Sequence, residues 1–310
     1  MKKVLIALGG NAILDKDPSA EAQIEIVRQT AKKIVSLIEQ GNEVIICHGN
    51  GPQVGNLLLQ QAACDSEGNP AMPLDSSVAM TQGSIGYWIQ QAIENELFVR
   101  RLQKPVATVV TQTLVSAADP AFSQPTKPIG PFYSEESAQQ LTAEGIPMME
   151  DGGRGYRRVV PSPKPLRIIE EEVVKSLVEK GIITIASGGG GIPVVETPAG
   201  YVGVEAVIDK DFSAERLAEF LQVDSFVMLT GVEHVFINYN QPNQQKLEQV
   251  PWRDMQRFVE EGQFAVGSML PKVEAAMSFV EVTGKEAIIT SLENLENIFS
   301  ETNRGTVIAC

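Results

Sequence analysis

Hydrophobic runs and helical repeats alternate along most of the chain. Continuous apolar runs at 3–9 and 43–49 are typical of parallel strands that are buried on both faces. Between them, residues 20–40 place apolar side chains at helical spacing, and Gly41 follows as a stop signal. The pattern predicts a strand, a helix and a second strand in succession.

The same alternation continues toward the C-terminus. Further strands are predicted at 105–111, 181–191, 225–231 and 286–291. Further helices are predicted at 76–102, 213–221 and 271–282. We therefore predict an α/β fold, a three-layer α/β/α sandwich around a largely parallel central sheet.

One region interrupts this rhythm. Eight of the 18 prolines lie between Pro120 and Pro165, in clusters such as "QPTKPIGPF" and "VVPSPKP". The segment is too long for a simple loop. We interpret residues of about 118–167 as a small subdomain inserted into the first of two lobes, since 310 residues exceed a single small core.

The charge balance limits the partners. The chain has 25 basic and 39 acidic residues and a formal net charge of −14. Nucleic acid and anionic membrane surfaces attract basic proteins, so we expect neither as a partner. An acidic protein that binds phosphates must concentrate its few cations locally.

The cysteines and the N-terminal residues indicate a cytoplasmic protein. Cys47, Cys64 and Cys310 form neither a disulfide framework nor a metal-ligand pair. The first apolar run is interrupted by Gly9 and Gly10, and no later run reaches the length of a membrane span. We expect neither a signal peptide nor a transmembrane helix.

Four predicted strands end in glycine-rich stretches. These stretches are "LGGN" (8–11), "HGNGPQVGN" (48–56), "SGGGGIPV" (187–194) and "LTGV" (229–232). A turn is by itself a sufficient reason for glycine. However, ligands of open α/β sheets bind beyond the carboxyl ends of the strands, where free backbone amides attract anions. Four such endings favour a phosphate or carboxylate site, although no G-x-x-x-x-G-K-[ST] motif is present.

Three lysines stand in unusual surroundings. Lys127 is framed by prolines, Lys210 is flanked by acids in "IDKDF", and Lys272 begins an apolar helix. Arg154, Arg157 and Arg158 form a second cationic group, which either clamps an anion or pairs with surface acids.

The remaining polar residues reveal neither a triad nor a metal site. His48 and His234 have no partners at suitable spacing. The absence of a clear nucleophile fits phosphoryl transfer, in which positioning and charge neutralisation supply most of the catalysis.

In combination, these motifs resemble the carbamate kinases of the amino acid kinase family, and the resemblance covers essentially the whole chain. The matching stretches include "ALGGNAI" (7–13), "HGNGPQVGNLL" (48–58), "PTKPIGPF" (125–132), "GGGGIPVV" (188–195), "VEAVIDKDF" (204–212) and "GSMLPKVEAA" (267–276). The resemblance implies a reversible reaction in which carbamoyl phosphate and ADP give carbamate and ATP, with Mg²⁺ bound to the nucleotide. It also implies a homodimer and a role in arginine or agmatine breakdown.

The resemblance implies a division of labour between the lobes. Residues 1–205, with the inserted subdomain, would bind carbamate or carbamoyl phosphate, and residues 206–310 would bind ATP or ADP. The residues expected to bind the substrate and its phosphoryl group are Gly9, Gly10, Asn11, Gly49, Asn50, Gly51, Gly189 and Gly190. Those expected to bind the nucleotide are Lys210, Thr230, Gly231, Val232, Met269 and Lys272.

Four residues are expected to be catalytic, namely Lys127, Lys210, Asp211 and Lys272. Carbamate is already an anionic nucleophile, so the site needs cations and amide donors rather than a general base. Asp211 would orient the lysines, with Asp209 as the weaker alternative. No protein ligand for Mg²⁺ is predicted.

Ala7 occupies a position at which many amino acid kinases have a lysine, two residues before the glycine pair. We hypothesise that Lys127, on the inserted subdomain, supplies the missing cation and excludes water. Two alternatives stay open. One is a kinase of the same fold with another carboxylate or phosphate-ester substrate, and the other is a nucleotide or metabolite sensor without activity.

Overall fold

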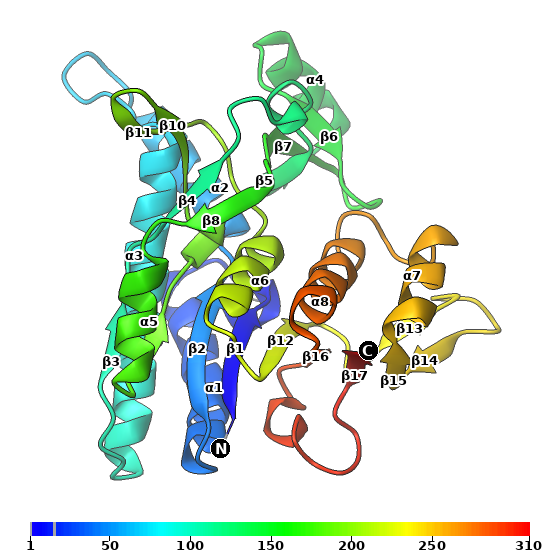
Figure 1. The fold of residues 1–310 in the computed structure, drawn as a ribbon. Coiled ribbons are helices and arrows are strands. Elements are labelled where there is room, and N and C mark those ends of the chain that lie inside the picture. The colour runs from blue at the N-terminus through cyan, green and yellow to red at the C-terminus, as the bar shows by residue number, and fades with distance from the viewer. Residues whose placement is uncertain (1, 15–16) are drawn as a thin grey trace.

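The central element of the molecule is an eight-stranded sheet (Figure 1). The structure is a computed structural model that describes residues 2–14 and 17–310. The strand order is β15-β17-β16-β12-β1-β2-β9-β3, and every neighbouring pair is parallel except β16 and β17. The strands are β1 (Lys3–Leu8), β2 (Glu43–His48), β3 (Val106–Thr108), β9 (Ile183–Ile185), β12 (Ser225–Thr230), β15 (Gln249–Pro251), β16 (Glu286–Ser291) and β17 (Thr306–Ala309).

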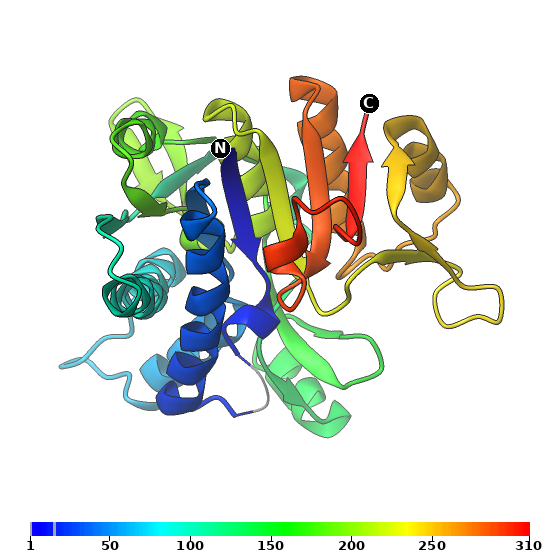
Figure 2. The same ribbon diagram turned by 90° about the horizontal axis from the view of Figure 1, so that it is seen from below.

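Helices cover both faces of this sheet. Helices α1 (Ala20–Glu39) and α3 (Leu74–Val99) pack on one face, and Figure 2 shows α1 lying along β1. The other face is covered by α5 (Glu171–Glu179), α6 (Lys210–Phe220), α7 (Trp252–Glu260) and α8 (Leu270–Thr283). The predicted three-layer sandwich with a largely parallel sheet is therefore confirmed.

Strand β1 explains why the apolar runs have no alternation. Val4, Ile6 and Leu8 belong to the core that includes α1, whereas Leu5 and Ala7 belong to the core that includes α6 and α8. All five are fully buried. A strand between two helical layers must be apolar on both faces.

A smaller antiparallel unit is inserted before α5 and stands above the carboxyl ends of the strands (Figure 1). Its elements are β5 (Lys127–Tyr133), α4 (Glu135–Ala143), β6 (Met148–Glu150) and β7 (Tyr156–Val160). The chain leaves and re-enters the body through a second sheet in the order β11-β10-β4-β8. Its strands are β4 (Gln112–Val115), β8 (Pro165–Ile168), β10 (Ile192–Thr197) and β11 (Gly200–Gly203).

The inserted unit rests on α2 (Gly51–Ala63) through two glycines. A side chain on Gly55 would collide with the backbone of Gly130, so Gly55 must be glycine for the two backbones to approach this closely, and Gly130 has a left-handed φ of 72° that favours glycine. The remaining elements are the hairpin of β13 (Val235–Ile237) and β14 (Gln245–Leu247), and short 3₁₀ turns at Gly10–Ala12, Pro120–Phe122, Gly188–Gly190 and Leu295–Asn297.

Two predicted strands are shorter in the structure. The strand predicted at 105–111 ends at Thr108, because both backbone polar groups of Thr111 are bound by the side chain of Gln82. The strand predicted at 181–191 ends at Ile185, because Ser187 has a left-handed φ of 54° and starts the glycine loop. In the part of the chain that the structure describes, no helix combines the length and apolar character needed to cross a membrane.

Candidate active site

A cavity of about 340 Å³ lies where β1, β2 and β12 end. It collects most of the predicted site residues from both halves of the sequence. They are Gly9, Gly10, Gly49, Asn50, Gly51, Lys127, Gly189, Asp209, Lys210, Asp211, Thr230, Gly231 and Lys272. Among the residues that the structure describes, the cavity lining contains three ammonium groups against two carboxylates, so an acidic protein concentrates positive charge here.

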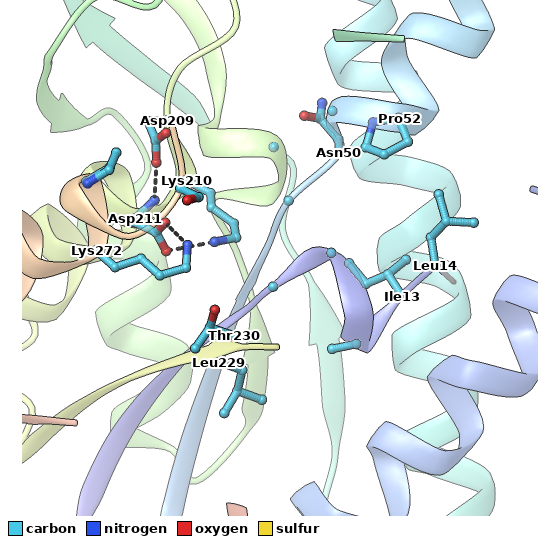
Figure 3. Close-up of a pocket in the computed structure, with 18 of the residues that line it drawn as sticks. Ile13, Leu14, Asn50, Pro52, Asp209, Lys210, Asp211, Leu229, Thr230 and Lys272 are labelled. Atoms are coloured by element: carbon cyan, nitrogen blue, oxygen red, sulfur yellow. Dashed lines mark hydrogen bonds and ion pairs between the residues drawn. The ribbon is translucent and has the colours of Figure 1, made fainter. Parts of the chain in front are cut away.

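The parallel strands and the helices that follow them create this geometry. The amide-rich stretch 9–11 follows β1, and Asn50 and Gly51 follow β2 and begin α2. Pro52 in the first turn of α2 needs no hydrogen-bond acceptor and presets the helical φ. Figure 3 shows Asn50 and Pro52 across the cavity from the lysine cluster. The helix N-terminus and the loop amides are suited to an anion.

Asp211 connects two lysines (Figure 3). One carboxylate oxygen accepts from Lys210 Nζ at 2.7 Å, and the other accepts from Lys272 Nζ at 2.6 Å. The side chain of Asp211 is only 3% exposed. Because one carboxylate holds both ammonium groups, the two cations are fixed at the same point of the cavity.

Burial and charge act against each other in this cluster. Burial lowers the pKa of Lys210, and the like charge of Lys272 adds to this effect against the attraction of Asp211. Burial also opposes the charge on Lys272, but Asp211 outweighs it and raises the pKa of Lys272. Burial would raise the pKa of Asp211, but the two lysines lower it. The carboxylate therefore stays ionised, and Lys210 is the cation that loses its proton more readily.

Lys127 reaches into the same cavity from the inserted unit. It forms an ion pair with Asp209, which also caps α6 by accepting from the backbone amide of Asp211 at 3.0 Å. Burial would raise the pKa of Asp209, but Lys127 and Lys210 lower it. The two carboxylates thus have separate partners: Asp211 binds Lys210 and Lys272, and Asp209 binds Lys127.

Ala7 lies beneath the lysine cluster rather than in it. It is fully buried and pairs in register with Cys47. The charge of Lys210 lowers the pKa of the Cys47 thiol, against the larger effect of burial. Burial raises the pKa of the Cys47 thiol, so this cysteine behaves as a core residue. The cations of the site come from β5, α6 and α8 instead of β1.

A second cavity of about 680 Å³ adjoins the first and shares Thr230, Gly231 and Ser268 with it. Val232 and Met269 line this second cavity, together with the aromatic pair Phe236 and Tyr239, whose ring centroids are 6.0 Å apart. Neither aromatic residue is predicted from the sequence, because no repeat or motif marks the stretch "VFINYN".

Some predicted residues lie elsewhere. Gly190 is not among the residues that line either cavity, and its carbonyl faces buried hydroxyl groups behind the glycine loop. The side chain of Asn11 falls outside the described part of the structure. Arg154 and Arg157 both form ion pairs with Asp151, and neither they nor Arg158 are among the cavity-lining residues.

Comparison with known proteins agrees with this architecture. Residues 2–291 match the model of the amino acid kinase family. The chain is 58% identical to carbamate kinase 2 of Enterococcus faecalis over 98% of each protein. It is 56% identical to carbamate kinase of Lentilactobacillus hilgardii over 99% of this chain and 97% of that relative.

Solved structures give the same result. Carbamate kinase from Giardia lamblia bound to citric acid superposes with a TM-score of 0.95 at 41% identity, and the form bound to AMP-PNP with 0.91 at 42%. Each comparison covers 99% of this chain and 98% of the other. The fold and its relatives define a phosphotransferase. The chain belongs to the amino acid kinase family and, within it, to the carbamate kinases.

Proposed function

We propose that the two cavities bind carbamoyl phosphate and ADP side by side and transfer the phosphoryl group between them. The observation that carries this proposal is the convergence of Lys127, Lys210 and Lys272 on a cavity ringed by loop amides. During transfer, a phosphoryl group carries negative charge on its peripheral oxygens, and fixed cations stabilise that charge.

The proposed step needs no general base. The bond between phosphorus and the carbamoyl oxygen breaks, and its electron pair remains on the departing carbamate. A terminal oxygen of the ADP β-phosphate forms the new bond to phosphorus, which gives ATP. Both reactants are anions, so the work of the site is to hold them in line against mutual repulsion.

We assign the substrate and the nucleotide to different parts of the chain. The loops 9–11 and 49–51, with Gly189, would bind carbamoyl phosphate within residues 1–205, and Lys127 would cover it from the subdomain at about 118–167. Residues 206–310 would bind the nucleotide. Lys210 and Lys272 would contact its phosphates, and the base would enter the second cavity between residues 230 and 269. The AMP-PNP complex of the Giardia carbamate kinase supports a nucleotide site in this fold.

Mg²⁺ belongs to this proposal as an ion that the nucleotide phosphates carry. Bound there, it would neutralise charge on the phosphate oxygens. Within residues 2–14 and 17–310, no three His, Cys, Asp or Glu side chains are grouped as a metal site. Asp209 and Asp211 already contact lysines. We therefore assign no protein ligand to the ion.

We also propose a homodimer that uses the face formed by α3 and the neighbouring β10–β11 hairpin. Tyr87 and Phe98 on α3 and Val202 on β11 are each more than half exposed there, and exposed apolar patches mark protein–protein interaction sites. Sedimentation velocity should give a dimer, and Tyr87→Asp should shift it toward monomer. A monomeric wild-type protein would contradict this assignment.

The cellular role rests on the resemblance to carbamate kinases. We propose a cytoplasmic enzyme that consumes carbamoyl phosphate formed in arginine or agmatine breakdown. The proposed reaction itself is tested with a panel of acyl phosphates, each supplied with ADP and Mg²⁺ and coupled to hexokinase. Carbamoyl phosphate should be the strongly preferred donor. Equal or greater rates with acetyl phosphate or an amino-acid acyl phosphate would refute the proposal.

A further inference from the structure

Buried hydroxyl groups hold the back of the glycine loop 188–191. The carbonyl oxygen of Gly190 accepts two hydrogen bonds of 2.8 Å, one from Thr113 Oγ1 and one from Ser213 Oγ. Both hydroxyl-bearing side chains are fully buried. A carbonyl with two donors is held in one orientation, because rotation of its peptide would break both bonds without water to replace them.

The hydroxyl groups of Ser187 and Ser213 form a hydroxyl chain that donates in one direction, from Ser187 to Ser213 and from Ser213 to the carbonyl of Gly190. Ser213 has a single hydroxyl proton, which it donates to Gly190. Ser187 Oγ lies 2.7 Å from Ser213 Oγ, so Ser187 is the donor in that bond. Ser187 has a left-handed φ of 54°, a conformation that a serine adopts only when its surroundings hold it. The hydroxyl chain therefore fixes the residue that starts the loop.

The side chain of Gln82 also holds the start of the loop. Its Nε2 donates to the carbonyl of Gly188 at 2.9 Å and to that of Thr111 at 3.0 Å. The amide of Ser187 donates to Thr111 Oγ1 at 2.9 Å. The carbonyls of Gly188 and Gly190 are thus bound by side chains behind the loop.

The loop amides differ in what they bind. Gly190 N and Gly191 N donate within the loop, to Ser187 and Gly188. Gly189 N has no acceptor among the described residues, and Gly189 is the loop glycine that lines the cavity. It has a φ of 63°, and a side chain here would collide with the amide of Asn50. The amide of Gly188 likewise has no acceptor among these residues, but Gly188 does not line the cavity, so the amide of Gly189 is the one that a bound anion can take.

We propose that Ser213 is a positioning residue that aims the Gly189 amide at the carbamoyl phosphate group. This inference rests on the proposed function and adds a residue to it. Ser213 lies in the first turn of α6, the same turn that carries Lys210 and Asp211. The hydroxyl of Ser213 bonds to Gly190 and Ser187, on either side of Gly188 and Gly189, and so ties the loop that carries the amide donor to the turn that carries the lysines.

Kinetics of Ser213→Ala test the proposal. The variant should raise the KM for carbamoyl phosphate about tenfold and leave the Kd for ADP within twofold of the wild type. Ser187→Gly should behave in the same way, because glycine tolerates the left-handed φ but lacks the hydroxyl. Ser225→Ala is the matched control, since its fully buried hydroxyl donates to Glu286 at 2.8 Å away from the cavity. Equal losses for both ligands, or a Tm change alone, would overturn the proposal.

A measurement without turnover separates this inference from the proposed function. Inorganic phosphate is titrated into ¹⁵N-labelled protein, and the amide resonance of Gly189 is followed. It should shift strongly in the wild type and in Ser225→Ala, and several-fold less in Ser213→Ala. An unshifted Gly189 amide in the wild type would overturn the inference. A wild type that forms no ATP would overturn the proposed function, and the titration would still decide the role of Ser213.

Discussion

Replacing Asp211 by asparagine tests whether one carboxylate organises the cations of the site. Asparagine has nearly the same shape but no charge, so Lys210 and Lys272 would face each other in a buried place without the carboxylate that contacts them both. Removing one partner of a buried ion pair lowers the free energy of unfolding by about 3–5 kcal/mol. The chain would avoid part of this cost by releasing a proton from Lys210, whose pKa is already lowered by burial.

The loss of a cation should appear in the rate. Removing one preorganised group that stabilises transition-state charge costs about 2.7–4 kcal/mol, which at about 1.4 kcal/mol per factor of ten corresponds to a decrease in kcat/KM of about 10² to 10³. ATP formation from carbamoyl phosphate and ADP, coupled to hexokinase, measures it. Asp254→Asn is the matched control, because Asp254 forms an exposed ion pair with Arg257 that contributes little. Turnover of Asp211→Asn within threefold of the wild type would refute the reasoning.

Three further predictions follow from the same geometry. Lys127→Ala should lower kcat/KM for carbamoyl phosphate at least 100-fold and leave the protein folded with an unchanged ADP affinity, although loss of the ion pair with Asp209 should lower the Tm; near-normal kinetics would exclude Lys127 as the replacement cation. Gly55→Ala should displace the inserted unit from Gly130 and raise the KM for carbamoyl phosphate but not the Kd for ADP, and equal effects on both would contradict the contact. Burial lowers the pKa of His48 to about 4, so the unfolded chain binds the extra proton first as the pH falls below about 6.5. The free energy of unfolding should then fall by up to about 3 kcal/mol between pH 7 and 4. Urea titrations at the two pH values measure this loss, which should be smaller by about this amount in His48→Gln than in the wild type.

The layered fold could be predicted because burial alone determines its pattern. A strand with helices on both faces must be apolar throughout, and β1 shows this in the sequence from Val4 to Leu8. The ends of strands were less predictable. The prediction for 105–111 failed at Thr111, where the side chain of Gln82, 29 residues earlier, takes the backbone groups that a strand would use. No local pattern carries that information.

The candidate site, like the fold, could be predicted from the sequence only in part. Glycine-rich strand ends indicated where a ligand would bind, because parallel strands end at one edge of the sheet. The pairing of Lys127 with Asp209, 82 residues apart, depends on how the inserted unit packs on the body. Phe236 and Tyr239 belong to a hairpin without a repeat or motif, so only the folded chain places them beside Met269.

The fate of the phosphorus atom tests the central claim most directly. ³¹P NMR follows carbamoyl phosphate after addition of the protein, Mg²⁺ and ADP, and distinguishes transfer to nucleotide from transfer to water. The account predicts that the carbamoyl phosphate signal is replaced by the γ-phosphate signal of ATP, and that this conversion is at least 100-fold slower in Lys127→Ala. Release of inorganic phosphate without ATP, or an equal initial rate of ATP formation by Lys127→Ala, would contradict it.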